Sequence, residues 1–264
     1  KPKIPRAVVH EDAQVLVVDK PAGLVTQPGK GHANDTLLNG VFAHRGGGGT
    51  GEPLEKFLRN LGARRDFGLL HRLDKETSGL LVIAKTPNAY DQLRRDFEAR
   101  RVDKDYLAIT AGIPVPPRGV VQARLKEVEL PNPEARGKYA SIKKAVISRQ
   151  GQEAVSAYTV LSHDDDRAKN APAALVQITI KTGRLHQIRA HMLFLHCHVL
   201  GDSLYLPSDT APALKNYPHP PRLCLHATRL GFKHPETAKW VHFTSPLPPD
   251  LARYAAKLHL RGAE

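Results

Sequence analysis

The chain has 264 residues, of which 39 are lysine or arginine and 26 are aspartate or glutamate, so the formal net charge is +13. Hydrophobic residues make up 41% and charged residues 25%, which is ordinary globular usage and excludes a disordered chain, a coiled coil and a collagen-like chain. No apolar run approaches the roughly 20 residues that a membrane-spanning helix needs. The excess of positive charge favours an anionic partner, nucleic acid first, although many soluble proteins are basic without one.

The two cysteines, Cys197 and Cys224, are too few for a disulfide framework and suit a reducing compartment. We therefore expect a cytoplasmic protein. The basic start, Lys-Pro-Lys, has no apolar stretch after it and is not typical of a signal peptide. Because residue 1 is lysine rather than methionine, an upstream domain could precede these residues.

Apolar runs and turn residues predict the first elements of the chain. A buried strand is expected over 15–18, and the glycine-rich stretch 46–51 is expected to be a loop, without the Gly-Lys-Ser/Thr ending of a phosphate-binding P-loop. A second buried strand over 80–84 precedes a helix. Thr86 is the expected N-cap of that helix, and Pro87 is its expected first residue.

The rest of the chain is richer in strands than in helices. Strands are predicted over 106–109, 119–128, 140–148, 155–161, 175–180, 223–232 and 239–243. Helices are predicted over 185–195 and 251–258. The segments 43–56, 162–173 and 206–217 are expected to be inserted loops that determine substrate specificity. With many strands and few βαβ units, we expect an α+β fold in a single domain over 1–264, with a core of about 10–255. Its central sheet should be mixed, largely antiparallel and flanked by helices and loops.

Two clusters of polar residues stand beside apolar segments. The first, residues 71–79, reads His-Arg-Leu-Asp-Lys-Glu-Thr-Ser-Gly. The second, residues 181–191, reads Lys-Thr-Gly-Arg-Leu-His-Gln-Ile-Arg-Ala-His. A loop held between buried elements positions its side chains well. The first cluster therefore offers a carboxylate and the second offers guanidinium groups.

These segments resemble the motifs of the RluA-type pseudouridine synthases. Residues 71–79 match the family's catalytic motif, which is His-Arg-Leu-Asp, two variable residues and Thr-Ser-Gly. Four other matches are Lys-Pro-Ala-Gly at 20–23, Lys-x-Tyr at 104–106, Gly-Arg-x-His-Gln-Ile-Arg at 183–189 and Gly-Asp-x-x-Tyr at 201–205. All five occur in the family's order. The chain is therefore identified as a member of this family over about residues 15–250.

The resemblance implies isomerisation of uridine to pseudouridine in RNA, with no cofactor and no metal. Asp74 would be the catalytic carboxylate, acting as a nucleophile at the sugar or the base, or as a base at C2′ of the ribose. Arg189 would be its partner, because a guanidinium keeps a desolvated carboxylate ionised. Tyr106 would pack on the flipped uracil, and it could help to remove the C5 proton.

Further motif residues are expected to bind the substrate: Arg72, His71, Arg184, His186, Gln187, Thr77 and Lys104. Arg72 either pairs with Asp74 or enters the RNA in place of the flipped base, and the resemblance favours the RNA role. His71 and His186 belong to a residue type that is more often structural than catalytic. Thr77 and the two residues after it are expected to shape the turn that presents Asp74.

Three other functions are weaker. A zinc site would have to draw on His191, His196, Cys197, His198, Cys224 and His226, but no Cys-x-x-Cys pair is present and the His-Cys-His run points successive side chains apart. A non-catalytic RNA-binding protein would need no carboxylate in such a loop. A kinase has His-Arg-Asp followed by an Asp-Phe-Gly motif, whereas here the order of residues 71–74 differs and neither an Asp-Phe-Gly motif nor a Gly-rich phosphate loop follows them.

The expected substrate is ribosomal or transfer RNA, because family members act on either and the motifs do not distinguish them. We expect a monomer with no membrane partner. Some family members carry an N-terminal S4 RNA-binding domain, which an upstream segment could supply. The basic face of the helix after Pro87 is expected to meet RNA phosphates and to make the affinity salt-sensitive. That face carries Arg94, Arg95, Arg100 and Arg101.

Overall fold

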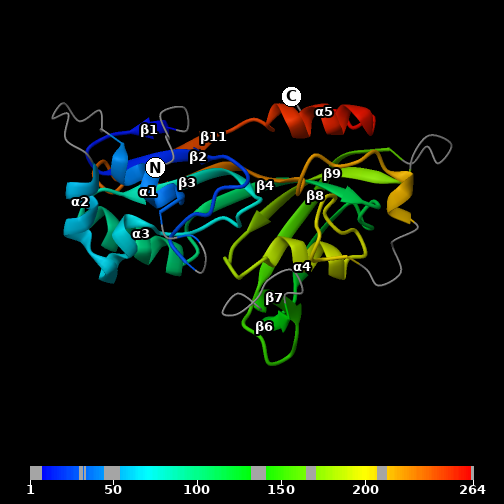
Figure 1. Ribbon diagram of the computed structural model, residues 1–264, viewed down its shortest axis with the longest axis horizontal. Helices are drawn as coiled ribbons and strands as arrows, with labels where there is room; N and C mark the ends of the chain where they lie inside the picture. The colour runs from blue at the N-terminus through cyan, green and yellow to red at the C-terminus, as the bar shows by residue number, and fades with distance from the viewer. Residues whose placement is uncertain are drawn as a thin grey trace. The chain divides into compact units, whose positions relative to one another are not determined.

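A computed structural model describes residues 8–29, 32, 34–44, 54–131, 141–164, 171–206 and 213–262. The chain forms two units, which Figure 1 shows with their helices and strands labelled. The first comprises residues 1–103 and 229–245, and the second comprises residues 104–228 and 246–264. The expected single domain over 1–264 stays a prediction.

The strands of the first unit follow the order β1-β2-β3-β10, with β11 paired to β10, and the pairs β1–β2, β2–β3 and β10–β11 are antiparallel. Its strands are β1 (Val8–Glu11), β2 (Val15–Lys20), β3 (Ser78–Ala84), β10 (Leu225–Lys233) and β11 (Trp240–Thr244). The first four residues of β10 belong to the second unit. Every residue of β3 is buried, which confirms the buried strand predicted over 80–84. The predicted strands over 15–18, 223–232 and 239–243 are also confirmed, within a residue or two at each end.

Helices of the first unit are α1 (Leu37–Ala43), α2 (Leu54–Leu61), the 3-10 helix η1 (Ala63–Gly68) and α3 (Pro87–Glu98). α3 begins as predicted, because the side chain of Thr86 accepts a hydrogen bond from the backbone N–H of Ala89 at 3.2 Å. α1, α2 and η1 were not predicted. The loop expected over 43–56 was therefore wrong at its ends, because α1 ends at Ala43 and α2 begins at Leu54. Residues 45–53 lie outside the described part.

The core of the first unit joins its sheet to α3. Side chains from three strands and the helix pack together, among them Val15, Val17, Leu80, Val82, Tyr90, Leu93, Leu230 and Phe232. Each buried aliphatic or aromatic side chain of this kind contributes about 1.5–3 kcal/mol relative to exposure. This packing holds β3 in place. The first polar cluster, residues 71–79, leads directly into β3.

The carboxylate of Asp12 ties β1 to the end of β10. Its Oδ2 lies 2.8 Å from Nε2 of His10 and 2.9 Å from Nε2 of His234. Its Oδ1 accepts from the backbone N–H groups of Gln14 at 2.8 Å and Val15 at 2.9 Å. Burial raises the pKa of Asp12, but these hydrogen bonds outweigh it and lower the pKa to about 2.

We expect Asp12→Asn to lower the melting temperature at neutral pH. A carboxyl whose pKa is lower in the folded state stabilises the fold above its unfolded pKa. That contribution is lost as pH falls from 3.8 towards about 2. The difference in melting temperature between wild type and Asp12→Asn should therefore shrink over this interval, followed by circular dichroism. A difference that stays constant with pH would contradict the assignment.

In the second unit, β4, β9, β8 and β5 pair in that order as antiparallel neighbours, and β10 is the neighbour of β4 in the same sheet. Its remaining strands are β4 (Asp103–Ala111), β5 (Arg118–Gln122), β8 (Val155–Asp164) and β9 (Ala173–Ile180). The strands predicted over 106–109, 155–161 and 175–180 are confirmed inside these longer ones. The loop predicted over 162–173 was wrong at both ends, because residues 162–164 still pair with β9. Residues 165–170 lie outside the described part.

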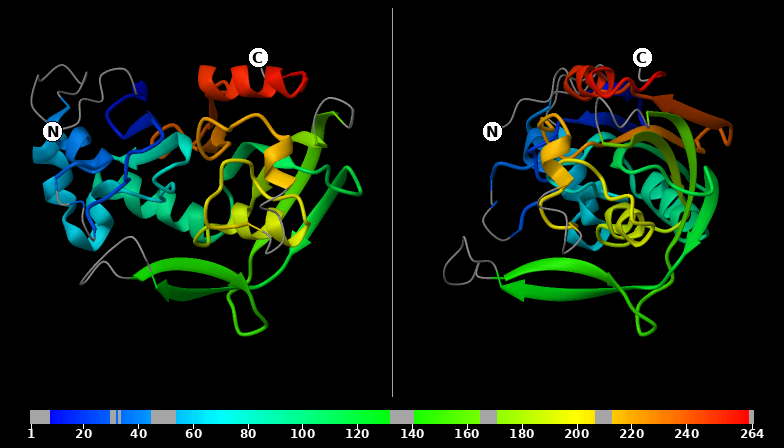
Figure 2. Two further views of the ribbon diagram at one scale, coloured as in Figure 1. Left: turned by 45° about the vertical axis from the view of Figure 1, so that its right-hand side comes forward. Right: turned by 90° about the vertical axis from the view of Figure 1, so that its right-hand side faces the viewer.

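A separate two-stranded sheet extends away from β8 and β9 in Figures 1 and 2. It consists of β6 (Leu125–Pro131) and β7 (Ser141–Ile147), here called the β6–β7 hairpin. The strand predicted over 140–148 is confirmed as β7. The single strand predicted over 119–128 was wrong, because the chain leaves β5 at Gln122 and enters β6 at Leu125. The break is held by Arg124, whose Nε donates to the carbonyl of Gly151 at 2.7 Å.

Helices of the second unit are α4 (Gln187–Phe194), the 3-10 helix η3 (Ala213–Asn216) and α5 (Pro249–Lys257). α4 contacts β7 and β8, and α5 buries Leu251, Tyr254 and Ala255. Both predicted helices are confirmed, although α4 begins two residues later than expected. No helix in the described residues is long and apolar enough to cross a membrane.

Candidate active site

The loop that carries Asp74 is fixed through its backbone on both sides of the aspartate. Thr26 Oγ1 donates to the carbonyl of Leu73 at 2.8 Å and accepts from the N–H of Leu73 at 3.3 Å. The carbonyl of Lys75 accepts from the N–H of Gly23 at 2.8 Å. These contacts leave the side chain of Asp74 half-buried on a held backbone. The Lys-Pro-Ala-Gly turn and Thr26 therefore support the loop that carries Asp74.

The buried cation of that turn is Lys20, which is 0% exposed. Its Nζ donates to the carbonyl oxygens of Leu24 at 2.7 Å, Pro21 at 2.9 Å and Lys75 at 3.0 Å. An ammonium has three donors, and hydrogen bonds from a charged group are roughly twice as strong as neutral ones. Lys20 thus ties the turn to the residue that follows Asp74. Sequence reasoning did not give Lys20 this role.

The other predicted residues of this loop differ in exposure. Nε2 of His71 accepts from the N–H of Val82 at 3.1 Å, which assigns its proton to Nδ1, and its ring lies 5.0 Å from that of Phe97. Arg72 is exposed. The backbone N–H of Thr77 donates to the carbonyl of Asp74 at 3.1 Å, which closes the turn. Within the described residues the buried Thr77 hydroxyl has no hydrogen-bond partner.

In the second unit, Lys104 and Tyr106 lie on the same side of β4, since side chains alternate along a strand. Both are buried. Burial lowers the pKa of the Lys104 ammonium to about 8, with a further contribution from the charge of Lys181. A methyl group on Gly183 would lie 3.6 Å from Nζ of Lys104. The Lys-x-Tyr motif and the turn before α4 therefore meet.

Gln187 holds that turn closed. Its Oε1 accepts from the hydroxyl of Thr182 at 2.7 Å and from the N–H of Arg184 at 3.1 Å. Its Nε2 donates to the carbonyl of Val155 at 3.0 Å and the hydroxyl of Ser156 at 2.9 Å. These four hydrogen bonds use both the amide oxygen and the amide nitrogen of Gln187 to hold the turn. That Gln187 contacts the substrate stays a prediction.

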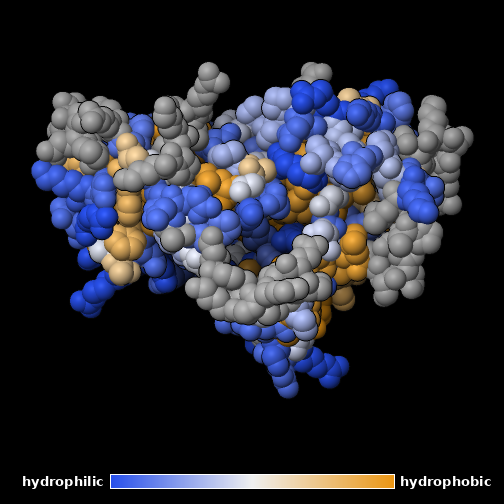
Figure 3. All heavy atoms as spheres, in the orientation of Figure 1, coloured by the Kyte–Doolittle hydropathy of each residue, from blue (hydrophilic) through white to orange (hydrophobic). Residues whose placement is uncertain are grey.

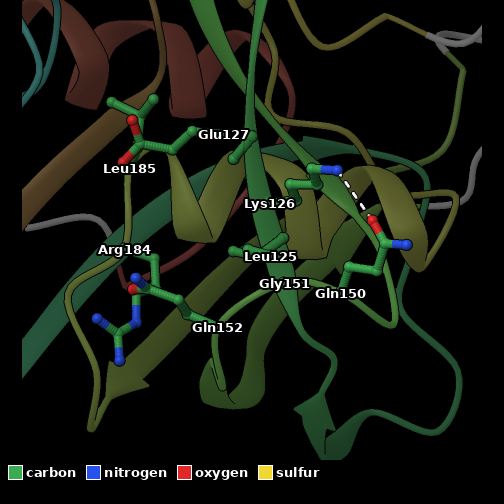
Figure 4. A pocket seen from close by; sticks show the side chains of 9 residues that line it. Leu125, Lys126, Glu127, Gln150, Gly151, Gln152, Arg184 and Leu185 are labelled. Carbon is green, nitrogen blue, oxygen red and sulfur yellow. Dashed lines mark hydrogen bonds between the residues drawn. The ribbon is translucent and has the colours of Figure 1, made fainter.

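Arg184 is exposed and lines a hollow of about 260 Å³ at the base of the β6–β7 hairpin (Figure 4). The hollow combines the apolar side chains of Leu125, Ala145 and Leu185 with polar groups that include Lys126, Gln150 and Gln152. Nε of Arg184 donates to the carbonyl of Glu153 at 3.0 Å. In Figure 4 its guanidinium points away from Lys126. The remaining donors of Arg184 are thus directed to the side opposite Lys126.

Arg189 makes a bidentate ion pair with Asp202, a residue that sequence reasoning did not select. Nε donates to Oδ2 at 2.7 Å and Nη2 donates to Oδ1 at 2.9 Å. Burial raises the pKa of Asp202, but the hydrogen bonds from Arg189 and the backbone outweigh it, so the pKa lies below its usual value. The only sequence signal for this pair was the Gly-Asp-x-x-Tyr match.

His186 occupies the N-cap of α4 in the left-handed region, with φ of 49°. Left-handed backbone is uncommon for a residue other than glycine and often marks a functional site. Its Nδ1 lies 3.1 Å from the hydroxyl of Tyr205. His191, which the zinc alternative used, is buried with Nδ1 at 2.9 Å from the hydroxyl of Ser156.

The structure thus groups the predicted residues by unit. His71, Arg72, Asp74 and Thr77 lie in the first unit, and Lys104, Tyr106, Arg184, His186, Gln187 and Arg189 lie in the second. The expected pairing of Asp74 with Arg189 stays a prediction.

A protein-family model described as RNA pseudouridylate synthase matches residues 14–194. The chain belongs to this family. The match covers the motifs at 20–23, 71–79, 104–106 and 183–189, so the resemblance is confirmed. The expectation of an RNA pseudouridine synthase, which is an isomerase, is confirmed with it, as is the α+β fold with a largely antiparallel sheet.

Similar proteins extend the family match to nearly the whole chain. The chain is 33% identical to an uncharacterised RNA pseudouridine synthase, YlyB, of Bacillus subtilis, over 97% of this chain and 73% of the relative. It is 36% identical to the ribosomal large subunit pseudouridine synthase D of Zymomonas mobilis, over 94% and 71%. The enzyme of that name from Neisseria meningitidis is 34% identical over 96% of this chain and 61% of its own length.

A solved structure agrees with this family assignment. Human RNA pseudouridylate synthase domain containing 4 aligns with a TM-score of 0.69 and 28% identity, covering 98% of this chain and 95% of that one. The present chain therefore shares its fold, over nearly its whole length, with a solved chain named as an RNA pseudouridylate synthase.

Proposed function

We propose that the protein isomerises uridine to pseudouridine in ribosomal RNA, acting as a monomer in the cytoplasm. The proposed substrate rests on the names of two relatives, both called ribosomal large subunit pseudouridine synthase D. One is 36% identical over 94% of this chain, and the other is 34% identical over 96%. Transfer RNA is the alternative substrate, and the experiment below includes it.

The reaction breaks the bond between N1 of uracil and C1′ of ribose and forms the bond between C5 and C1′. C5 loses a proton and N1 gains one, so atoms and electrons balance without an oxidant, a reductant or water. Asp74 is the proposed catalytic carboxylate, either as a nucleophile or as a base at C2′. Support for this role comes from its loop, whose backbone is held at Leu73 and Lys75 and leaves the carboxylate half-buried.

Tyr106 and Arg189 complete the proposed catalytic set. A buried tyrosine ring is a suitable surface for a flipped pyrimidine. Arg189 is proposed to keep the Asp74 carboxylate ionised. Arg72 and Arg184 are exposed cations of the two motif segments and are proposed to contact RNA.

The face seen in Figure 3 is largely hydrophilic over the described side chains. Two of the arginines expected to meet phosphates already have acidic neighbours: Arg94 Nε lies 2.7 Å from Glu98, and Arg101 Nη2 lies 2.6 Å from Asp96. Arg94 and Glu98 are both exposed, and such a pair contributes only about 0–1 kcal/mol, so a phosphate can displace Glu98 at small cost. Asp96 is buried, so Arg101 stays paired with it and offers RNA only its remaining donors. Arg94 therefore stays in the proposed RNA surface.

The test uses transcribed ribosomal RNA and transfer RNA that contain no modified nucleotides. Each is incubated with the protein, and pseudouridine is mapped by chemical labelling and mass spectrometry. We expect one or a few sites in ribosomal RNA and none in transfer RNA. Pseudouridine in transfer RNA alone would overturn the substrate, and no pseudouridine in either, with RNA still bound, would overturn the enzymatic function. Light scattering checks the monomer, and cell fractionation checks the location.

We expect kcat/KM to fall as pH rises through about 8, where Lys104 loses its charge. A cation that contacts RNA weakens binding when it is neutralised. In Lys104→Met, kcat/KM should be low throughout and this fall should be absent. The control is Lys126→Met, which replaces an exposed lysine of the β6–β7 hairpin. This variant should show the same fall in kcat/KM with rising pH as wild type. The same fall in Lys104→Met would show that another group titrates.

A further inference from the structure

The guanidinium of Arg189 is fixed from two directions by buried side chains. Asp202 holds its edge with two hydrogen bonds of 2.7 and 2.9 Å, and the ring of Tyr205 lies 4.9 Å from Cζ. The Asp202 side chain is 0% exposed and Tyr205 is 1% exposed. A planar guanidinium with a bidentate carboxylate and an aromatic face has its orientation set.

Asp202 is itself held in place by the backbone. Its Oδ1 accepts from the N–H of Leu204 at 2.9 Å and of Tyr205 at 3.0 Å. The residue before it, Gly201, has φ of +77°, and a Cβ there would clash with the carbonyl of Arg222. Only glycine fits this position. The turn that carries Asp202 is therefore rigid.

Tyr205 connects this turn to the β6–β7 hairpin. Its hydroxyl accepts from the backbone N–H of Ala145 at 2.7 Å and lies 3.1 Å from Nδ1 of His186. Nζ of Lys144 donates to the carbonyl of Leu204 at 2.9 Å and lies 4.8 Å from the centre of the Tyr205 ring. The support of Arg189 thus reaches from α4 to β7.

We propose that Asp202 and Tyr205 are positioning residues for the isomerisation, which act by fixing the Arg189 guanidinium, and that β7 sets this support through the Tyr205 hydroxyl. The proposal rests on the proposed function. A carboxylate that only stabilised the fold would affect melting without acting through Arg189. The two roles differ in how the effects of substitutions combine, because residues that act as a unit are not additive.

The experiment is a double-mutant cycle on pseudouridine formation in the wild-type substrate RNA. The variants are Asp202→Asn, Arg189→Ala and both together, in the full chain, with kcat, KM and melting temperature measured for each. We expect Asp202→Asn to lower kcat by about 10- to 100-fold, the usual loss for residues that orient an active-site ligand, with KM unchanged. The double variant should have the kcat of Arg189→Ala. It loses both charges of the pair, so it carries no unpaired buried charge.

The matched control is Asp250→Asn, which breaks another arginine–aspartate pair of the same unit. Nε of Arg222 donates to Asp250 at 2.7 Å and Nη2 does so at 3.3 Å. This variant should lower the melting temperature and leave kcat unchanged. If the losses in kcat from Asp202→Asn and Arg189→Ala multiply in the double variant, the positioning role is overturned. The proposed function then still stands, since wild type still forms pseudouridine.

Tyr205→Phe keeps the aromatic ring and removes the hydroxyl, and it decides the matter if Asp202→Asn does not fold. We expect a smaller fall in kcat with KM unchanged, and a changed Nε–H resonance of Arg189 in an arginine-labelled sample. An unchanged kcat and an unchanged resonance would overturn the role of Tyr205 and its link to β7. Wild-type protein that forms no pseudouridine would instead overturn the proposed function.

Discussion

Replacing Asp74 by asparagine is expected to abolish pseudouridine formation, with a loss in kcat of about 1,000-fold or more, the scale of removing an essential catalytic group. The amide has the shape of the carboxylate but is neither a nucleophile nor a base. The loop should keep its conformation, because it is held through the backbone of Leu73 and Lys75. Product is quantified by mass spectrometry over time, and RNA affinity is measured by filter binding.

The control for this substitution is Glu76→Gln, an exposed carboxylate of the same loop. It removes one negative charge two residues away and should leave kcat near that of wild type. RNA affinity should be retained in both variants, because cations supply most of the affinity. Wild-type rates in Asp74→Asn would show that Asp74 is not the catalytic group, whereas lost RNA binding would show that it acts in recognition.

Elements with a strong local signal could be predicted from the sequence. β3 is an uninterrupted apolar run, and α3 begins with a threonine cap and a proline at its first position. α1 and α2 carried weaker signals, since they have 7 and 8 residues and flank a glycine-rich stretch. Leu54, Leu58 and Leu61 have the spacing of one helix face, but three apolar residues are a weak signal for α2, which was not predicted. Helices this short depend on tertiary packing, which a local pattern does not contain.

The candidate site also has a part that the sequence predicts and a part that it does not. Asp74 and Arg189 stand in contiguous motifs and could be named from the sequence. Their supports could not, because these depend on contacts between distant residues. Lys20 bonds to the carbonyl of Lys75, 55 residues along the chain, and the Tyr205 hydroxyl bonds to Ala145, 60 residues away. The motifs indicate the candidate residues, and the fold shows which groups hold the Asp74 loop and the Arg189 guanidinium.

Replacing Lys20 by methionine is expected to give the largest loss of stability among the motif residues. The change removes three hydrogen bonds from a charged donor to carbonyl oxygens, and hydrogen bonds to charged groups contribute about 1.5–3 kcal/mol each. Some of this is offset because a buried charge is removed. We expect the free energy of unfolding to fall by about 3 kcal/mol and the melting temperature by about 6–12 °C. Lys239→Met, an exposed lysine of the same unit, should change neither.

The same substitution separates stabilisation from positioning at Asp74. Lys20 bonds to the carbonyl of Lys75, so without it this carbonyl keeps the hydrogen bond from the N–H of Gly23 and loses the one from the charged donor. A misplaced catalytic group lowers kcat strongly even when the protein is folded. We therefore expect kcat to fall at least about tenfold at a temperature well below the melting transition. Full activity of folded Lys20→Met would mean that Lys20 stabilises the turn, and that Thr26 and Gly23 suffice to hold Asp74.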